Sequence, residues 1–247
     1  MILLVDSGNT RVKWALAHQG LWVAKGAASP EELSSVWADL WIPKRVFIAH
    51  VGGEKAKRHI GDALAPWSAP IFWVRPEACA MKMSCLYDRR QLGVDRWVAA
   101  LAAWELKRQA CLVAHAGTAL VVDAVGEDGA FLGGIIAPGK KLMEESLLQG
   151  TAGIGKALFE ERASIADSPF PVSTGEAVRS GLLWAASGAV LRARETLLRH
   201  TPDFSFVLTG GDAFWLAQSL PFPSEIEEDL VLKGLFYLSS LSEEKHA

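Results

Sequence analysis

The sequence predicts an α/β protein made of two related halves, and three observations support this fold class. Residues 4–10 and 113–118 are both apolar strands that end in a polar residue and then turn on a glycine and a threonine. In each half, strands come first and helices follow. The chain has 247 residues, of which 50% are hydrophobic, so it can fill two cores. We place the boundary near residues 105–111, which gives domains 1–108 and 109–247.

The first half opens with a hairpin and ends with a helix. Turn residues 7–10 separate two apolar runs, which is typical of a hairpin. A periodic helix begins at Gly93, and Trp97, Leu101 and Trp104 mark one of its faces. In order, we expect strands at 2–6 and 11–17, a helix near 30–39, a strand at 45–49, a helix at 54–65, a strand at 71–74 and a helix at 93–107.

The second half repeats this order of elements. Strands on both sides of the turn 116–118 form a second hairpin, and Pro138 and Gly139 separate a third strand from a helix. Gly188 is a candidate interruption in a long helical segment. We expect strands at 111–115, 119–125 and 131–136, helices at 140–149 and 173–199, a strand at 204–208, and helices at 213–219 and 226–238.

Composition excludes several classes of protein. The formal net charge is −3 and no basic block stands out, so we expect no nucleic-acid partner. No apolar run reaches the roughly 20 residues of a membrane span, and Asp6 comes too early for a signal peptide. Cys79, Cys85 and Cys111 lack disulfide or zinc spacing, which favours a cytoplasmic location. We expect the ten tryptophans to pack in the core and in interfaces.

The two hairpin turns are the first candidate site. Glycine amides and a hydroxyl can approach phosphate oxygens closely, so two such turns facing one cleft could hold a nucleotide's phosphates. Asp6 could simply stabilise its turn, or it could hold Mg²⁺ directly or through water. Asn9, Thr10 and Lys13 add an amide, a hydroxyl and an ammonium group to the same hairpin.

Three further motifs have both a structural and a chemical interpretation. Asp95 could cap its helix, or it could act as a general base beside Arg96, whose guanidinium could grip a substrate carboxylate. Residues 173–176 fit a capping box. Residues 209–212 suit either a sharp strand-to-helix turn or the close approach of a nucleoside.

Taken in order, these motifs resemble those of the type III pantothenate kinases, members of the acetate and sugar kinase/Hsc70/actin superfamily. They extend over nearly the whole chain, and the ordered set is far more specific than any one motif. The matching residues are Asp6-x-Gly8-Asn9-Thr10 with Lys13, Leu92-Gly93-Val94-Asp95-Arg96-Trp97, Gly117-Thr118-Ala119, Gly133-Gly134-Ile135-Ile136-Ala137-Pro138-Gly139, Thr174, Thr209-Gly210-Gly211-Asp212 and Asp229-Leu230-Val231-Leu232-x-Gly234-Leu235.

The resemblance implies two duplicated ribonuclease-H-like domains of the actin-like ATPase fold, with a cleft between them. It implies ATP- and Mg²⁺-dependent phosphorylation of pantothenate to 4'-phosphopantothenate, the first step of coenzyme A biosynthesis, by a homodimer that binds substrate near the subunit interface. The implied ATP-binding residues are Asp6, Ser7, Gly8, Asn9, Thr10, Arg11, Val12, Lys13 and Thr118. The implied substrate-binding residues are Tyr87, Gly93, Val94, Asp95, Arg96 and Thr174, with Asp95 as the proton acceptor. Tyr87 lies about one residue closer to Gly93 than the family pattern has it.

His115 departs from the family pattern, which has an aspartate there as a ligand for K⁺ or NH₄⁺. One outcome is an impaired enzyme that acts as a regulatory accessory factor. The other is that protonated His115 supplies the missing positive charge, because nearby phosphates favour the imidazolium form. His115 could also merely pack at the strand end, and Asp123 is an alternative cation ligand. Another superfamily enzyme, such as a phosphatase or a sugar kinase, is a further alternative function.

Overall fold

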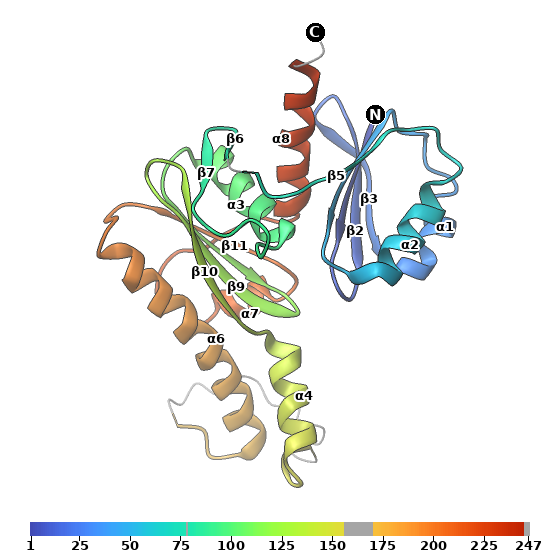
Figure 1. Cartoon of the computed structure of the whole chain (residues 1–247). Coiled ribbons are helices and arrows are strands. Elements are labelled where there is room, and N and C mark those ends of the chain that lie inside the picture. The colour runs from blue at the N-terminus through green and yellow to red at the C-terminus, as the bar shows by residue number, and fades with distance from the viewer. Residues whose placement is uncertain (78, 156–169, 245–247) are drawn as a thin grey trace. The chain divides into compact units, whose positions relative to one another are not determined.

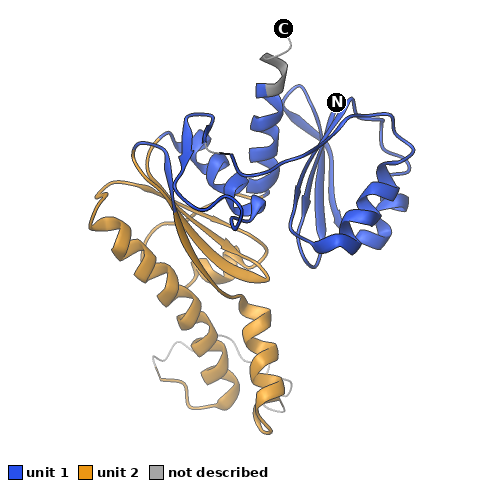
Figure 2. Ribbon diagram, in the orientation of Figure 1, with its two compact units in different colours: residues 1–108, 128–132, 229–247 blue, residues 109–127, 133–228 orange. Residues whose placement is uncertain are grey.

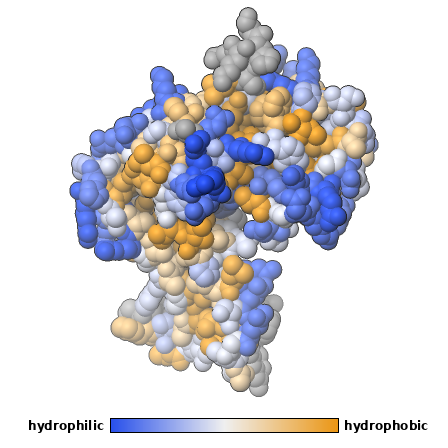
Figure 3. Space-filling model, viewed as in Figure 1, coloured by the Kyte–Doolittle hydropathy of each residue, from blue (hydrophilic) through white to orange (hydrophobic). Residues whose placement is uncertain are grey.

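The computed structural model describes residues 1–77, 79–155 and 170–244 (Figure 1). It divides into two compact units (Figure 2). Unit 1 comprises Met1–Arg108, Asp128–Leu132 and Asp229–Ala247, and unit 2 comprises Gln109–Glu127 and Gly133–Glu228. Within the described residues, no helix is both long enough and apolar enough to cross a bilayer. The face drawn in Figure 3 mixes hydrophilic with hydrophobic residues.

A five-stranded sheet organises the N-terminal part of unit 1, in the order β3-β2-β1-β4-β5. The strands are β1 (Ile2–Ser7), β2 (Val12–His18), β3 (Leu21–Ala28), β4 (Arg45–His50) and β5 (Ile71–Trp73). The central strand β1 pairs antiparallel with β2 and parallel with β4. This register sets Lys13 opposite Asp6 and His50 opposite Ser7, so polar side chains from three strands gather where β1 ends.

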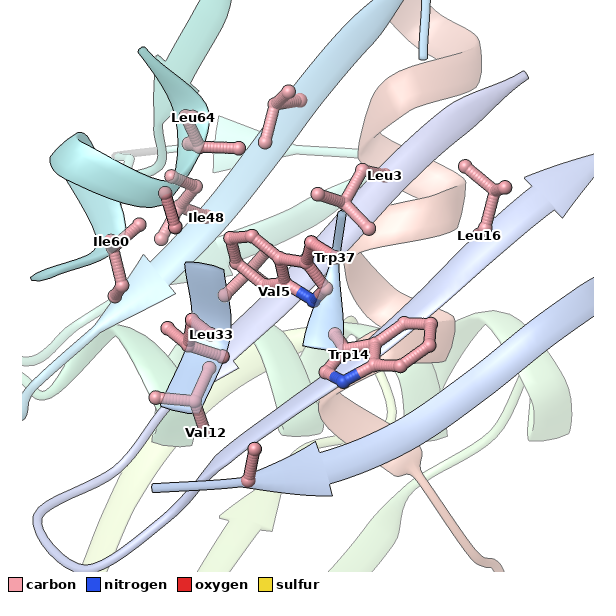
Figure 4. Close-up of a cluster of buried hydrophobic side chains, with 13 residues drawn as sticks. Leu3, Val5, Val12, Trp14, Leu16, Leu33, Trp37, Ile48, Ile60 and Leu64 are labelled. Atoms are coloured by element: carbon pink, nitrogen blue, oxygen red, sulfur yellow. The ribbon is translucent and has the colours of Figure 1, made fainter. Parts of the chain in front are cut away.

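Both faces of this sheet are covered, which explains the continuous apolar run in β1. Leu3 and Val5 point to one face, where they join a buried cluster with Leu33 of α1 (Leu33–Val36) and Ile60 of α2 (Gly53–Leu64) (Figure 4). Leu4 is also fully buried, and because side chains alternate along a strand it points to the opposite face. Helix α8 (Leu230–Glu244) contacts β1 and β4, and α3 (Val94–Lys107) contacts β4.

The close crossing of α3 and α8 fixes the start of each helix. A Cβ at Gly234 would lie 2.2 Å from the carbonyl oxygen of Val98, so only glycine allows this approach. Val98 and Gly234 both lie about one turn beyond their helix N-termini. The crossing therefore brings Asp95 and Asp229, which lie at those N-termini, to the same region of unit 1.

A small hairpin completes unit 1. It consists of β6 (Cys79–Ala80) and β7 (Met83–Cys85), and β7 pairs with Ala130 and Phe131 at the start of β10 (Ala130–Pro138). The ring of Phe131 meets those of Tyr87 and Trp97 edge to face, each with 6.2 Å between centroids. This contact ties the segment around Tyr87 to the first turn of α3.

Unit 2 repeats the strand pairing of unit 1. Its strands follow the order β12-β11-β8-β9-β10, with β8 (Cys111–Ala116), β9 (Ala119–Val125), β11 (Ser205–Thr209) and β12 (Glu225–Ile226). Like β1, the strand β8 pairs antiparallel with the strand that follows it and parallel with a later strand, here β11. The helices are α4 (Lys140–Gly150), α6 (Thr174–Leu198) and α7 (Ala213–Ala217).

Most predicted elements are present, and the differences have local causes. The helix expected near 30–39 is only a 3-10 turn, Pro30–Glu32, followed by the four residues of α1. Helix α8 begins at Leu230 rather than near 226, and α6 runs through Gly188 without a break. Trp41 and Trp184 are 65% and 49% exposed, so these two tryptophans do not belong to the core of the chain.

Strand β3 was not predicted, because glycine and lysine interrupt its apolar pattern. Gly26 is paired with Trp14 of β2, and a Cβ at Gly26 would lie 2.9 Å from the indole ring. The tryptophan therefore packs on the bare backbone of β3. The strands β6, β7 and β12 were also missed, since each has only two or three residues.

Candidate active site

The hairpin turn after β1 exposes polar groups on a fixed backbone. The Gly8 N–H donates to the carbonyl of Arg11 at 3.2 Å, which closes the turn. The Arg11 guanidinium donates to the carbonyl of Ala27 at 3.3 Å. Asn9 and Thr10 are exposed at the turn, whereas Val12 is fully buried in the core. Of the predicted phosphate contacts, Val12 could therefore contribute only its backbone.

Asp6 sits in a strongly acidic environment. Burial, followed by the nearby Asp95 carboxylate, raises the pKa of Asp6 from 3.8 to about 7. Lys13 opposes this shift, and Asp229 adds to it. The structure thus brings together Asp6, Lys13 and Asp95, which the sequence placed in two separate motifs. Such a group of carboxylates favours the binding of a cation.

Asp95 lies in the first turn of α3, with its carboxylate folded back over Gly93. Its Oδ1 accepts a hydrogen bond from the backbone N–H of Arg96 at 2.9 Å. A Cβ at position 93 would come within 2.6 Å of the same oxygen, so the Gly-x-Asp spacing is required by this geometry. The carboxylate is fixed through one oxygen, and the second oxygen can serve another partner.

Arg96 and Tyr87 form a stacked pair beside this turn. The Arg96 guanidinium carbon lies 5.3 Å from the centroid of the Tyr87 ring, and Arg96 is only 7% exposed. This cation–π contact holds the Tyr87 ring beside the first turn of α3. Tyr87 therefore lies beside the predicted substrate residues, although its distance along the chain differs from the family pattern.

A pocket of about 1,080 Å³ lies within unit 1, next to the start of α3. We call it the unit 1 pocket. Tyr87, Gly93 and Val94 are among the residues that line it. Its volume is enough for a small organic substrate. Three predicted substrate residues thus line open space, and one of them, Val94, directly precedes Asp95.

The sequence missed the opposite wall of this pocket, which includes His50, Lys57 and Trp73. His50 Nδ1 lies 2.9 Å from the hydroxyl of Ser7, with which it shares a hydrogen bond. Burial lowers the pKa of His50 from 6.5, and the Lys57 ammonium acts in the same direction. The signal in the sequence that could have indicated His50 as a site residue is its position at the carboxyl end of an apolar strand.

Unit 2 holds the other predicted site residues. Thr118 is exposed at the turn between β8 and β9, and its carbonyl accepts the Gly139 N–H at 3.0 Å. The His115 ring lies close to two glycine turns: a Cβ at Gly210 would be 2.8 Å from its Cδ2, and one at Gly117 would be 3.3 Å from its Nε2. Thr174 is exposed at the start of α6.

Asp123 and the start of α6 complete the description of unit 2. Asp123 is buried on β9, at 4% exposure. The Ser173 hydroxyl accepts the Glu176 N–H at 3.3 Å, which is one of the two hydrogen bonds of the predicted capping box. Thr174 therefore combines an exposed hydroxyl with a capped, well-defined helix start.

The donor set around Asp6 fits Mg²⁺ bound with a nucleotide. Carboxylate oxygens suit this ion, and Mg²⁺ usually keeps several waters and substrate phosphates as ligands. Among the described residues, no three His, Cys, Asp or Glu side chains group closely enough to hold a metal by themselves. Asp6 can therefore hold Mg²⁺ directly or through water, with the remaining ligands coming from phosphate and solvent.

Replacing Asp6 with asparagine should stabilise the ligand-free protein increasingly as the pH rises. The folded pKa of about 7 exceeds 3.8, so the native state holds a proton that the unfolded chain has lost. Wild-type stability must then fall as the pH rises from about 4 to about 7. The neutral amide lacks this dependence, and its advantage should reach about 1–3 kcal/mol near pH 8.

Urea unfolding between about pH 5 and pH 8 measures this difference. Asp62→Asn, at an exposed position on α2, is the matched control and should track the wild type. Parallel pH profiles for Asp6→Asn and the wild type would contradict the unusual pKa of Asp6.

Comparison with known proteins identifies the family. The type III pantothenate kinase family model matches residues 2–195. The chain is 38% identical to the type III pantothenate kinase of Nitrosospira multiformis, over 97% of this chain and 91% of that protein. It is 39% identical to that of Chromobacterium violaceum, over 97% of this chain and 100% of that protein.

Solved structures confirm the actin-like α/β fold. A Baf family protein from Campylobacter jejuni, described as a transcriptional activator, matches with a TM-score of 0.66 at 19% identity, covering 98% of this chain and 99% of that one. MreB 5 of Spiroplasma citri bound to AMPPNP matches with a TM-score of 0.54 at 11% identity, covering 99% and 97%. The family match and the close sequence relatives agree with the motif order, and the chain belongs to the type III pantothenate kinases.

Proposed function

We propose that this chain transfers the γ-phosphoryl group of ATP to the primary hydroxyl of pantothenate, giving 4'-phosphopantothenate for coenzyme A biosynthesis. The observation that carries this proposal is the group formed by Asp6, Lys13 and Asp95 beside the unit 1 pocket. Phosphoryl transfer depends mainly on positioning and charge neutralisation, and these residues supply both.

Each residue has a proposed role in this reaction. Asp95 accepts the proton of the attacking hydroxyl. It uses its second carboxylate oxygen, because Oδ1 already accepts the hydrogen bond from the Arg96 N–H. Lys13 neutralises phosphate charge, and residues 6–11 and Thr118 contribute backbone and hydroxyl donors to the phosphates. Tyr87, Gly93, Val94, Arg96 and Thr174 contact pantothenate. Mg²⁺, held through Asp6, neutralises the phosphates when it is bound.

We further propose a cytoplasmic homodimer of duplicated domains, divided near residue 108. The similar pairing of β1 and β8 supports duplication. Exposed apolar side chains on or next to α4 and α6 support self-association: Leu142, Phe170, Val172 and Trp184 are all more than 40% exposed. A cytoplasmic location is proposed because the two substrates, ATP and pantothenate, are available there.

A regulatory role without catalysis has no comparable support. The likeness to the Baf family protein is at 19% identity and establishes a shared fold only. The retained Asp6, Lys13 and Asp95 are the groups that a phosphoryl transferase needs and that a binding module does not. A phosphatase or a sugar kinase is disfavoured by the family match over residues 2–195.

The Asp95→Asn variant tests the proposed base. The amide cannot accept the proton of the hydroxyl, so turnover of pantothenate should fall by about 10²-fold or more. A coupled ATPase assay with pantothenate measures the rate, and circular dichroism checks that the fold is unchanged. Asp62→Asn should retain wild-type activity. Full activity in Asp95→Asn would remove this residue from its proposed role.

His115 is proposed to replace the family's monovalent cation. K⁺ prefers oxygen ligands, and the imidazole that occupies this position offers nitrogen, so position 115 does not fit that ion. Asp123 is buried on β9 and remains the alternative ligand. Protonated His115, near two glycine turns of unit 2, would provide a positive charge for phosphate instead.

Activity in buffers free of K⁺ and NH₄⁺ tests this replacement. The wild type should be active there, with at most a small further increase on adding either ion. His115→Asp restores the family's carboxylate and should make the rate depend on K⁺. Strict dependence of the wild-type enzyme on K⁺ or NH₄⁺ would rule out the replacement.

A further inference from the structure

We infer that Lys57 and Arg75, on the wall of the unit 1 pocket away from α3, bind the carboxylate end of the acceptor and so determine its specificity. The inference rests on the proposed function, because it assigns one end of the proposed substrate, pantothenate, to one wall of the unit 1 pocket. Lys57 comes from α2 and Arg75 follows β5, so neither belongs to the motifs that resemble the family.

The pocket has a basic lining in a chain whose net charge is −3. Lys57, Arg75, Arg89 and Arg90 line it, with Asp88 as the one acidic lining residue named among the described part of the chain. Arg90 is neutralised by Asp88, since its Nε and terminal nitrogen each lie 3.2 Å from a carboxylate oxygen. The remaining positive charge therefore favours an anionic ligand.

The two proposed residues are available for such a ligand. The carboxylate nearest to Lys57 belongs to Glu54, at 3.9 Å on the solvent-exposed face of α2, and such a pair contributes little. Within the described residues, Arg75 has no ion-pair partner, and its side chain is exposed. A substrate carboxylate could thus form ion pairs with Lys57 and Arg75 without breaking a strong existing ion pair.

An aromatic platform holds the Lys57 ammonium in place. Its nitrogen lies 5.4 Å from the centroid of the Trp73 ring, a cation–π distance. The ring of His50 meets the same indole edge to face, with 5.7 Å between centroids. Trp73 is held by the pairing of β5 with β4, and Arg75 follows it by two residues. The charged wall is therefore supported by the sheet.

The pocket connects this wall to the site of phosphoryl transfer. It is lined at one end by Gly93 and Val94, the residues directly before Asp95. A long hydroxy acid can place its hydroxyl at that end and its carboxylate at Lys57 and Arg75. Arg96, the other candidate for the carboxylate, is 7% exposed beneath Tyr87 and is not itself a lining residue. Its proposed contact with pantothenate therefore lies at the end of the acceptor next to Asp95, which leaves the carboxylate to Lys57 and Arg75.

The test compares pantothenate with pantothenol, in which an alcohol replaces the carboxylate. Lys57→Gln and Arg75→Gln should each raise the KM for pantothenate about tenfold, and the double variant should raise it further. The kcat should stay within about twofold, and the KM for pantothenol should not change. Lys57→Arg and Arg75→Lys keep the charge and should recover most of the affinity.

Matched controls are Lys55→Gln and Arg58→Gln, which remove a charge from exposed positions on the same helix outside the pocket lining. Both should keep the wild-type ratio of KM values for the two acceptors. Melting temperatures check that all variants fold. An unchanged ratio in the double variant overturns the carboxylate subsite, even if the enzyme is fully active.

Calorimetric binding of pantothenate separates this inference from the proposed function. If the wild type shows no turnover but binds pantothenate, and the double variant binds it about tenfold more weakly, the subsite stands and the proposed reaction fails. If the wild type neither turns over nor binds pantothenate, both are overturned. Turnover with an unchanged acceptor ratio overturns the subsite alone.

Discussion

The burial of the Asp6 carboxylate next to that of Asp95 is the constraint on which the rest of the proposed site depends. Both carboxylates lie in unit 1, Asp229 adds to their negative potential, and Lys13 offsets only part of it. In the ligand-free protein a proton on Asp6 relieves this conflict below about pH 7. In the proposed reaction Asp6 would hold Mg²⁺, whose charge would favour the ionised form of this carboxylate. The site is thus electrostatically prepared for a cation-bound nucleotide and is less stable without it.

The fold imposes this proximity through backbone geometry. Asp6 lies near the carboxyl end of β1, the central strand of a sheet that is covered on both faces. The pairing of β1 with β2 sets Lys13 opposite Asp6. The crossing at Gly234 holds the start of α3 against α8, and Gly93 leaves room for the Asp95 carboxylate. These glycines are remote from one another in sequence, yet both are needed to place one carboxylate. Interior packing and site electrostatics are therefore determined by the same contacts.

Local patterns in the sequence were enough to predict the elements that carry the chemistry. The hairpin around Asp6, the helix that begins near Asp95 and their assignment to one family all followed from apolar periodicity and short motifs. The edge strand β3 was not predictable, because its Gly26 is covered by Trp14 from another strand. Likewise, the wall formed by Lys57 and Arg75 comes from α2 and the end of β5, which meet only after the sheet has formed. No local pattern encodes that meeting.

Burial and, after it, the nearby Asp95 carboxylate hold the pKa of Asp6 far above its ordinary value, and a direct titration tests this. Carboxyl carbon NMR of the ligand-free protein, with the Asp6 signal assigned through Asp6→Asn, reports that pKa without any assay of activity. We expect Asp6 to titrate near pH 7 in the wild type and at a lower pH in Asp95→Asn. Titration of Asp6 near its ordinary 3.8 in both proteins would contradict it.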